Sequence, residues 1–388
     1  MTVRGATVCV PINYRIDGLL LVRGSSLKLL QIVPRLPPRM DGIGDHAVRL
    51  AQQLRKFHNI ETSFLVCDPD WKGPAEIDSS AIQTLRQRDA AEFSRAISNS
   101  DSNAILLQFA PYGYSIKGCP LWLANGIERS SQEHARTFIS MFHELEAGRR
   151  KPWNSTFWLS PIQKRLIRRI AACSTFQFTN TAYHQQKLHE WGYDAVKLLP
   201  SFSTIGEPVE NLPTTERERQ IIIFGRPWQR SLSYTEGIEA LNAACKLIDA
   251  EKIIDIGAPI SSESSDNICG LPLVRCGSLP SREISSLMSK SIASFIFYPE
   301  ALLTKSSIYA ASCAHGAIPF VEFKYRGDRS LMKTELEVDK DYFTVRRPES
   351  IYNSTNLLKM STQVYERYQS RNSSSAASKI ASSMKSIS

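Results

Sequence analysis

The feature that most constrains this chain is an alternation of short apolar runs with helix-like segments, which occurs twice. The first series begins with the apolar run 27–33 and continues to about residue 200, and the second extends over 221–321. Apolar runs of this length are typical of buried strands. Their alternation with helices favours a mostly parallel sheet that is covered on both faces. We therefore predict an α/β protein with two Rossmann-like, doubly wound domains and an interdomain cleft.

Residues 199–219 interrupt this alternation with prolines, a glycine and a charged run, and this composition is typical of a linker. Serine, alanine and lysine dominate the last residues, a composition that favours disorder. We therefore divide the chain into six segments: an N-terminal extension (1–25), a first domain (26–200), a linker (201–219), a second domain (220–348), a closing helix (349–371) and a disordered tail (372–388).

Within the first domain, strands are expected at 27–33, 62–67, 104–109, 137–142 and 176–179, and helices from Asp45, near 90–98, at 161–172 and after Thr181. Within the second, strands are expected at 221–224, 252–256, 293–298 and 317–321, and helices at 235–247, 281–289 and 305–314.

Composition excludes several classes of protein. A chain of 388 residues is too long for one typical core, and 42% hydrophobic with 22% charged residues is ordinary for a soluble globular protein. No apolar run reaches the roughly 18–20 residues that cross a bilayer, and the first thirty residues lack an uninterrupted signal-peptide core. The eight cysteines form no CxxC pair and have no metal-ligand spacing, so we expect a cytoplasmic protein without a structural zinc site.

The formal charge of +9 is concentrated between Arg149 and Arg169, where tryptophans are interleaved with the basic residues. Leu159, Ile162, Leu166 and Ile170 have the spacing of one buried helical face. The basic residues are then a solvated face, or a patch for anionic lipid or a polyanionic acceptor. No recognised nucleic-acid-binding module is found, so we expect no nucleic-acid partner.

A glycine loop follows the first predicted strand. Gly42 and Gly44 are placed in the turn, and Asp45 is a candidate N-cap for the helix that follows. Unpaired N–H groups at a helix N-terminus can bind a phosphate or sugar oxygen. An ordinary strand–helix turn is the alternative.

Three further groups of residues follow predicted strands. His143 and Glu144 come directly after the strand 137–142, where a neutral histidine can exchange a proton and a carboxylate can orient it. Gly225 and Arg226 end the strand 221–224, with Arg230 four residues later, and guanidinium groups suit a diphosphate.

The third group lies at the start of the predicted helix 305–314. Lys305 and Ser306 bring a cation and a hydroxyl to the helix start, where an anion can bind. His315 and Gly316 are interpreted as the end of that helix.

These motifs, in this order, resemble those of two-domain GT-B glycosyltransferases of the retaining, family-4 type. The resemblance covers most of residues 27–370. It implies that Gly42 and Gly44 meet the donor phosphate and the acceptor, that His143 and Glu144 line the active site, and that Arg226 and Arg230 bind the nucleotide diphosphate. The chain departs from the family's Glu-x7-Glu pattern, because Leu303 and Ala311 take the places of the two glutamates.

Glu300 is a candidate replacement for the first glutamate and a possible contact of the donor sugar, and Lys305 with Ser306 is a candidate replacement in donor binding. The reaction that the resemblance implies moves a sugar from a nucleotide-diphosphate sugar to a hydroxyl of a polysaccharide, glycolipid or metabolite, with retention of configuration. It implies no cofactor and no metal, because cationic side chains stabilise the leaving group. The alternatives are a GT-B nucleotide-sugar epimerase, a phosphorylase, or a degenerate nucleotide-sugar-binding protein.

Overall fold

The computed structural model describes residues 27–39, 41–133, 136–147, 153, 155–208, 212–260, 266–323, 334–345 and 354–386. The expected N-terminal extension lies outside the described residues, as do Arg149, Arg150 and Lys151 of the basic segment.

The first domain is built on an eight-stranded sheet with the order β3-β4-β2-β1-β5-β6-β7-β8. All of its pairings are parallel except that of β3 with β4. Its strands are Leu27–Val33 (β1), Ile60–Val66 (β2), Glu76–Ile77 (β3), Ser80–Thr84 (β4), Ala104–Phe109 (β5), Thr137–Phe142 (β6), Phe176–Thr179 (β7) and Lys197–Leu198 (β8).

Helices cover both faces of this sheet, because alternate residues of a strand point to opposite sides. On β1, Leu30 and Ile32 pack in one apolar cluster with side chains of the helices 90–98, 121–133 and 155–172, whereas Leu29 packs in another with side chains of the helices 42–58 and 373–385. The helices are Gly42–His58 (α1), Ala90–Ser98 (α2), Pro111–Tyr114 (α3), Leu121–Glu133 (α4), Ser155–Ala172 (α5) and Ala182–Glu190 (α6).

The second domain has a six-stranded sheet with the order β11-β12-β10-β9-β13-β14, parallel except between β11 and β12. Its strands are Glu218–Phe224 (β9), Lys252–Ile256 (β10), Asn267–Ile268 (β11), Leu271–Gly277 (β12), Ser291–Phe297 (β13) and Ile318–Glu322 (β14). Its helical segments are Thr214–Glu216 (η1), Pro227–Tyr234 (α7), Ile238–Leu247 (α8), Ser281–Lys290 (α9), Glu300–Lys305 (η2), Ser307–Ala314 (α10) and Ser354–Gln369 (α11).

The two sheets confirm the predicted fold class. In the first sheet β1 lies between β2 and β5, and in the second β9 lies between β10 and β13, so the chain reverses its direction of winding at each of these points. Ligands of open α/β sheets bind beside the carboxyl ends of the strands at such a reversal. The segments that follow β1, β5, β9 and β13 are therefore where a site is to be sought.

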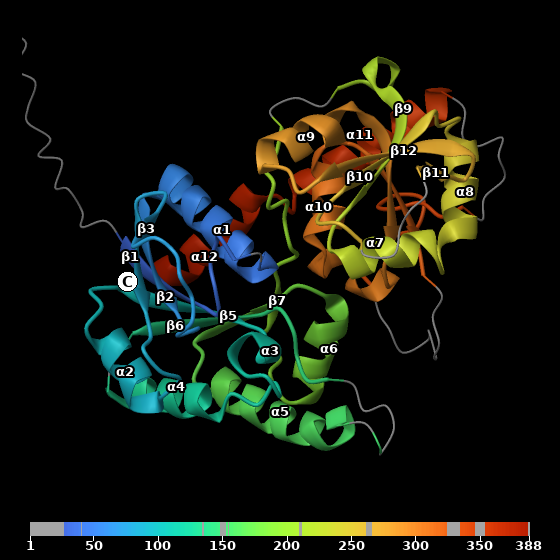
Figure 1. Ribbon diagram of the computed structural model, residues 1–388. Coiled ribbons are helices and arrows are strands. Elements are labelled where there is room, and N and C mark those ends of the chain that lie inside the picture. Colours follow the sequence, from blue (N-terminus) through green and yellow to red (C-terminus); the bar gives the residue numbers. More distant parts are fainter. Residues whose placement is uncertain are drawn as a thin grey trace, which may run out of the picture.

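The prediction of a disordered tail is wrong. Residues Ser373–Lys385 form a helix, α12, with Asn372 as N-cap, and it returns to the first domain and packs against α1 (Figure 1). Alanine and serine are small enough to let two helices approach closely, and Ile380 and Met384 bury their side chains in the resulting interface. The expected closing helix is α11, and residues 349–353 lie outside the described part of the chain.

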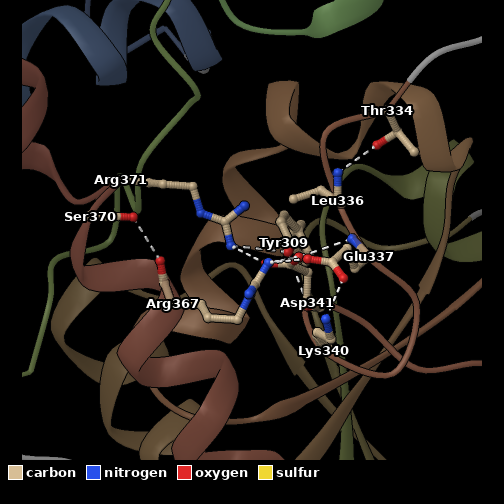
Figure 2. Close-up of polar contacts among 9 residues, drawn as sticks. All are labelled: Tyr309, Thr334, Leu336, Glu337, Lys340, Asp341, Arg367, Ser370 and Arg371. Carbon is tan, nitrogen blue, oxygen red and sulfur yellow. Dashed lines mark hydrogen bonds and ion pairs between the residues drawn. The ribbon is translucent and has the colours of Figure 1, made fainter.

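A cluster of charges holds α11 to the segment 334–345 (Figure 2). The buried carboxylate of Asp341 accepts hydrogen bonds from Arg367 Nη2 at 2.7 Å and from Arg367 Nε at 2.9 Å. Arg371 Nη2 donates to the same carboxylate at 3.1 Å, and the hydroxyl of Tyr309 donates to the Asp341 carbonyl at 3.0 Å. These contacts also reach α10, so Asp341 ties three segments of the second domain together.

Several element boundaries differ from the prediction. Helix α1 begins at Gly42, and its N-cap is Asp41, not Asp45, because the Asp41 carboxylate accepts from the Ile43 N–H at 3.0 Å. The helix predicted at 235–247 is α8, which begins at Ile238, and α7 precedes it where no helix was predicted. Helix α5 begins at Ser155, and its Ile162 is half exposed, so this residue does not belong to the buried face. In the residues that the structure describes, no helix is long and apolar enough to span a membrane.

Candidate functional site

An ion pair joins the two domains at the carboxyl ends of their sheets. Lys305 Nζ, at the end of η2, donates to Glu144 Oε1, two residues beyond the end of β6. Both side chains are partly exposed. The phenol of Tyr298 lies within electrostatic reach of this pair and of Arg226; burial raises its pKa, and the two cations oppose that rise. The structure therefore brings together Glu144, Lys305 and Arg226, which lie far apart in the sequence.

His143 lies at the first-domain side of this pair, directly after β6, and its side chain is buried. Its ring belongs to a chain of hydrogen bonds inside the sheet. His143 Nε2 lies 2.7 Å from Gln108 Oε1, Gln108 Nε2 lies 2.8 Å from Gln31 Oε1, and Gln31 Nε2 lies 3.1 Å from the Ala47 carbonyl oxygen.

The direction of these hydrogen bonds follows from their last member. The Ala47 carbonyl can only accept, so Gln31 donates its amide N–H there and accepts from Gln108 through its own oxygen. Gln108 must then accept through its oxygen, and His143 donates through Nε2–H. Nδ1 of the neutral ring is thereby left as an acceptor, and within the described residues it makes no hydrogen bond.

Two further buried histidines surround His143. His46 lies on α1 with its ring stacked on Phe202 at 4.3 Å and edge-on to His143 at 5.0 Å between centroids. Burial lowers the pKa of His46 to about 3. Burial, and then the nearby ammonium of Lys305, lowers the pKa of His184 to about 3. For His143, burial, His46 and Lys305 lower the pKa well below its usual range, so all three rings are neutral at pH 7.

The two glycines of the glycine loop, Gly42 and Gly44, have different roles. A Cβ on Gly42 would meet no atom within 4 Å, so the start of α1 is open at this position. A Cβ on Gly44 would lie 2.5 Å from the Arg35 carbonyl oxygen, so this glycine is needed for the close approach of α1 to the preceding loop. Burial raises the pKa of Asp45 to about 6, with Asp41 adding to the rise and Arg226 opposing it. The first turn of α1 therefore faces Arg226 of the other domain.

Arg226 is an exposed cation at the N-cap position of α7, two residues after β9 ends, where the second domain's chain reverses its direction of winding. Its guanidinium makes no hydrogen bond or ion pair with the described part of the chain. The preceding Gly225 has φ +143°, and a Cβ there would lie 2.7 Å from Ile308 Cδ1 on α10. Glycine is thus required at the point where β9 turns into α7, just before Arg226.

Arg230 has a different place from the one predicted. Its side chain is only 1% exposed, and Nη1 donates to Asp255 Oδ1 of β10 at 2.8 Å. The phenol of Tyr234 also donates to Asp255, and Arg230 Nη2 donates to the Ala258 carbonyl. The Arg230 guanidinium is therefore occupied by partners inside the second domain, so we remove Arg230 from the diphosphate-binding set.

The remaining predicted residues also make contacts within the protein. Ser306 is the N-cap of α10 and accepts from the Tyr309 N–H at 3.2 Å, so its hydroxyl caps the helix. Glu300 begins η2, and its carboxylate adds to the effect of burial, which raises the pKa of Tyr342 to about 12. Gln31, Gln108 and His46 were missed by the sequence reasoning. The two glutamines could have been recognised as candidates from the sequence, because each is a polar residue inside an otherwise apolar strand.

No group of three or more His, Cys, Asp or Glu side chains that could hold a metal ion occurs among the described residues. Within the described part of the chain, Arg226 and Lys305 are two cations at this edge of the second sheet that are suited to a bound anion.

Solved structures with the same architecture exist. An alpha-glucosyltransferase in complex with UDP and a 13-mer DNA containing a central A:G mismatch has a TM-score of 0.57 and 11% identity, covering 93% of this chain and 100% of that chain. An alpha-glucosyltransferase in complex with UDP has a TM-score of 0.56 and 12% identity, covering 91% of this chain and 98% of that chain. A putative UDP-N-acetylglucosamine 2-epimerase from Listeria monocytogenes has a TM-score of 0.54 and 13% identity, covering 94% of this chain and 97% of that chain.

These similarities establish that the chain has the GT-B fold. No family model matches the chain, and no curated protein sequence matches it.

Proposed function

We propose that this protein is a glycosyltransferase that moves a sugar from a nucleotide-diphosphate sugar to a hydroxyl acceptor. The observation that carries the proposal is the pair of switch points of a GT-B fold facing each other, with Arg226 and Lys305 on one side and His143 and Glu144 on the other. The GT-B neighbours in complex with UDP support a nucleotide as the donor's carrier.

In the proposed complex the diphosphate lies between the two cations. Lys305 exchanges the Glu144 carboxylate for a phosphate oxygen, and Arg226 binds a second one with its free guanidinium. Both cations then stabilise the charge that develops as the bond between the sugar and the diphosphate breaks. The open backbone at Gly42 gives the acceptor and the diphosphate room to meet.

We propose retention of configuration. The bond between the anomeric carbon and the acceptor oxygen forms on the face that the diphosphate leaves, and the acceptor proton passes to the leaving diphosphate. His143 does not supply the base, because burial holds its pKa far below its usual range and its Nε2 is occupied by Gln108. Its free Nδ1 is suited to accept a hydrogen bond from a sugar hydroxyl.

The first experiment measures donor affinity. Wild type should bind a UDP- or GDP-sugar, and Arg226→Ala should weaken that binding by about 1.5–3 kcal/mol, the cost of a lost charge-assisted contact. Lys305→Ala should do the same. Arg95→Ala is the matched control, because Arg95 is exposed on α2 of the first domain. Equal affinity in wild type and both cleft variants would place the diphosphate elsewhere.

A second candidate is a nucleotide-sugar epimerase, which the Listeria neighbour favours. The two activities separate when the donor is incubated without and with a panel of hydroxyl acceptors. Conversion of the nucleotide sugar to its epimer without an acceptor would replace transfer as the function. Binding without turnover across the panel would indicate a non-catalytic protein, and NMR of a transfer product would give its anomeric configuration.

A further inference from the structure

One corner of the first domain exposes large apolar side chains beside basic ones. We call it the α5 corner: Tyr112, Ile116, Lys117, Trp153, Trp158, Ile162, Arg165 and Arg168. Ile116 is 91% exposed, Trp153 76% and Trp158 68%. Single exposed apolar residues are normal, but several at one place indicate an interaction surface.

The exposed side chains of α5 change from apolar to basic along the helix. Its exposed positions carry Trp158 and Ile162 in the first half, then Arg165 and Arg168 in the second. Leu166 and Ile170 are buried against the domain. Across the residues that the structure describes, Arg165, Arg168 and Lys117 have no ion-pair partner, so their charge is available to an external anion.

Residues of α3 and of the loop after it belong to the same corner. Gln163, which follows Ile162, donates through Nε2 to the Lys117 carbonyl at 3.1 Å and to the Tyr112 hydroxyl at 3.3 Å. These bonds hold the 112–118 loop against the middle of α5 (Figure 1). Gln163 Oε1 also accepts from the Ala147 N–H at 2.8 Å. The corner is therefore fixed to the segment that carries His143 and Glu144.

We infer that the α5 corner attaches this protein to the surface of an anionic lipid bilayer. The exposed tryptophan, tyrosine and isoleucine side chains of this corner can insert at the level of the lipid headgroups, where aromatic side chains are favoured. Lys117, Arg165 and Arg168 lie beside them and complement the negative surface of such a membrane. A soluble polyanion would be served by the charges alone and would leave the exposed tryptophans unexplained. This attachment does not depend on the proposed glycosyl transfer.

The test is flotation of the full chain with vesicles, which needs no turnover. The protein should float with vesicles of equal parts phosphatidylcholine and phosphatidylglycerol, and not with phosphatidylcholine alone. Arg165→Ser and Arg168→Ser should each weaken binding about fivefold, because one basic residue near an anionic surface contributes that much. Trp158→Ser should weaken binding at both low and high salt, and the tryptophan emission of wild type should shift to the blue on binding.

Two variants of the second domain serve as controls and should bind like wild type. Arg282→Ser removes an exposed arginine of α9, and Leu358→Ser removes an exposed apolar residue of α11. The inference is overturned if the protein binds both kinds of vesicle equally or neither. It is also overturned if Trp158→Ser binds anionic vesicles as tightly as wild type, because charge alone would then account for binding.

Discussion

At the scale of single residues, Gln108 is the middle of the chain of hydrogen bonds that runs from the Ala47 carbonyl to His143, and we predict the effect of replacing it. Gln108→Leu removes the acceptor of His143 Nε2–H and the donor to Gln31. We expect the ring of His143 to lose its single tautomer, and the variant to be destabilised by about 1–3 kcal/mol, because buried polar groups lose their partners. Nitrogen-15 NMR of histidine-labelled protein measures the tautomer, and urea unfolding measures the stability.

The same variant separates a positioning role from a structural one. If Gln108 orients His143 for the donor sugar, turnover of Gln108→Leu should fall more than its donor affinity. Gln83→Leu on β4 is a matched control, because this glutamine lies on a short strand near the edge of the same sheet. A wild-type tautomer in Gln108→Leu would contradict the proposed role of the hydrogen-bond chain.

The sequence predicted the position of a single residue correctly where that position depends only on the strand to which the residue belongs. His143 was expected at the end of the strand 137–142, and it lies there because β6 ends at Phe142. Arg230 was misplaced because its partner, Asp255, lies on another strand of the sheet. No pattern within residues 225–230 indicates that partner. The same holds for Lys305 and Glu144, whose ion pair depends on how the two domains meet.

At the scale of the element, α12 makes the next prediction. Ile380 is fully buried against the first domain, so Ile380→Ala should reduce the free energy of unfolding by about 2–4 kcal/mol. Ser382→Ala is the control, because Ser382 is exposed and its hydroxyl bonds only to its own helix. Urea unfolding of both variants measures the effect. An equal, small change in both would mean that α12 does not stabilise the domain.

The elements also indicate why the prediction from the sequence was incomplete. Strands buried on both faces are continuous apolar runs, so β1, β5 and β6 were predicted with the same first and last residues that the structure shows. Helix α12 has few large apolar residues, and its burial depends on small side chains that fit α1. Composition alone assigns such a segment to disorder, because composition does not reveal a partner helix.

At the scale of the whole molecule, burial of histidine predicts how stability depends on pH. Burial lowers the pKa of His46 and His184 to about 3 and that of His315 to about 4, and it also lowers the pKa of His143 well below its usual range. In the unfolded chain these rings have pKa values near 6.5. Unfolding therefore takes up protons below that value, so this stability is fully present above about pH 6.5 and is lost as the pH falls. Asp45 has the opposite effect on stability. Its pKa in the folded protein is raised to about 6, so below that pH the folded protein holds one proton that unfolding releases.

The prediction is that the free energy of unfolding decreases from about pH 7 to pH 5, by about 1.4 kcal/mol per pH unit for each net proton taken up. His46→Phe should reduce that slope by nearly one proton and should stabilise the protein at low pH, because the ring nitrogens of His46 have no hydrogen-bond partner in the described residues. Phe202→Leu alters the same ring stack without removing a titrating group, so it should lower stability equally at all pH values. Urea unfolding across this range measures both. A slope in His46→Phe equal to that of wild type would mean that His46 is already protonated in the folded protein, and that the cleft is more open to water than its burial indicates.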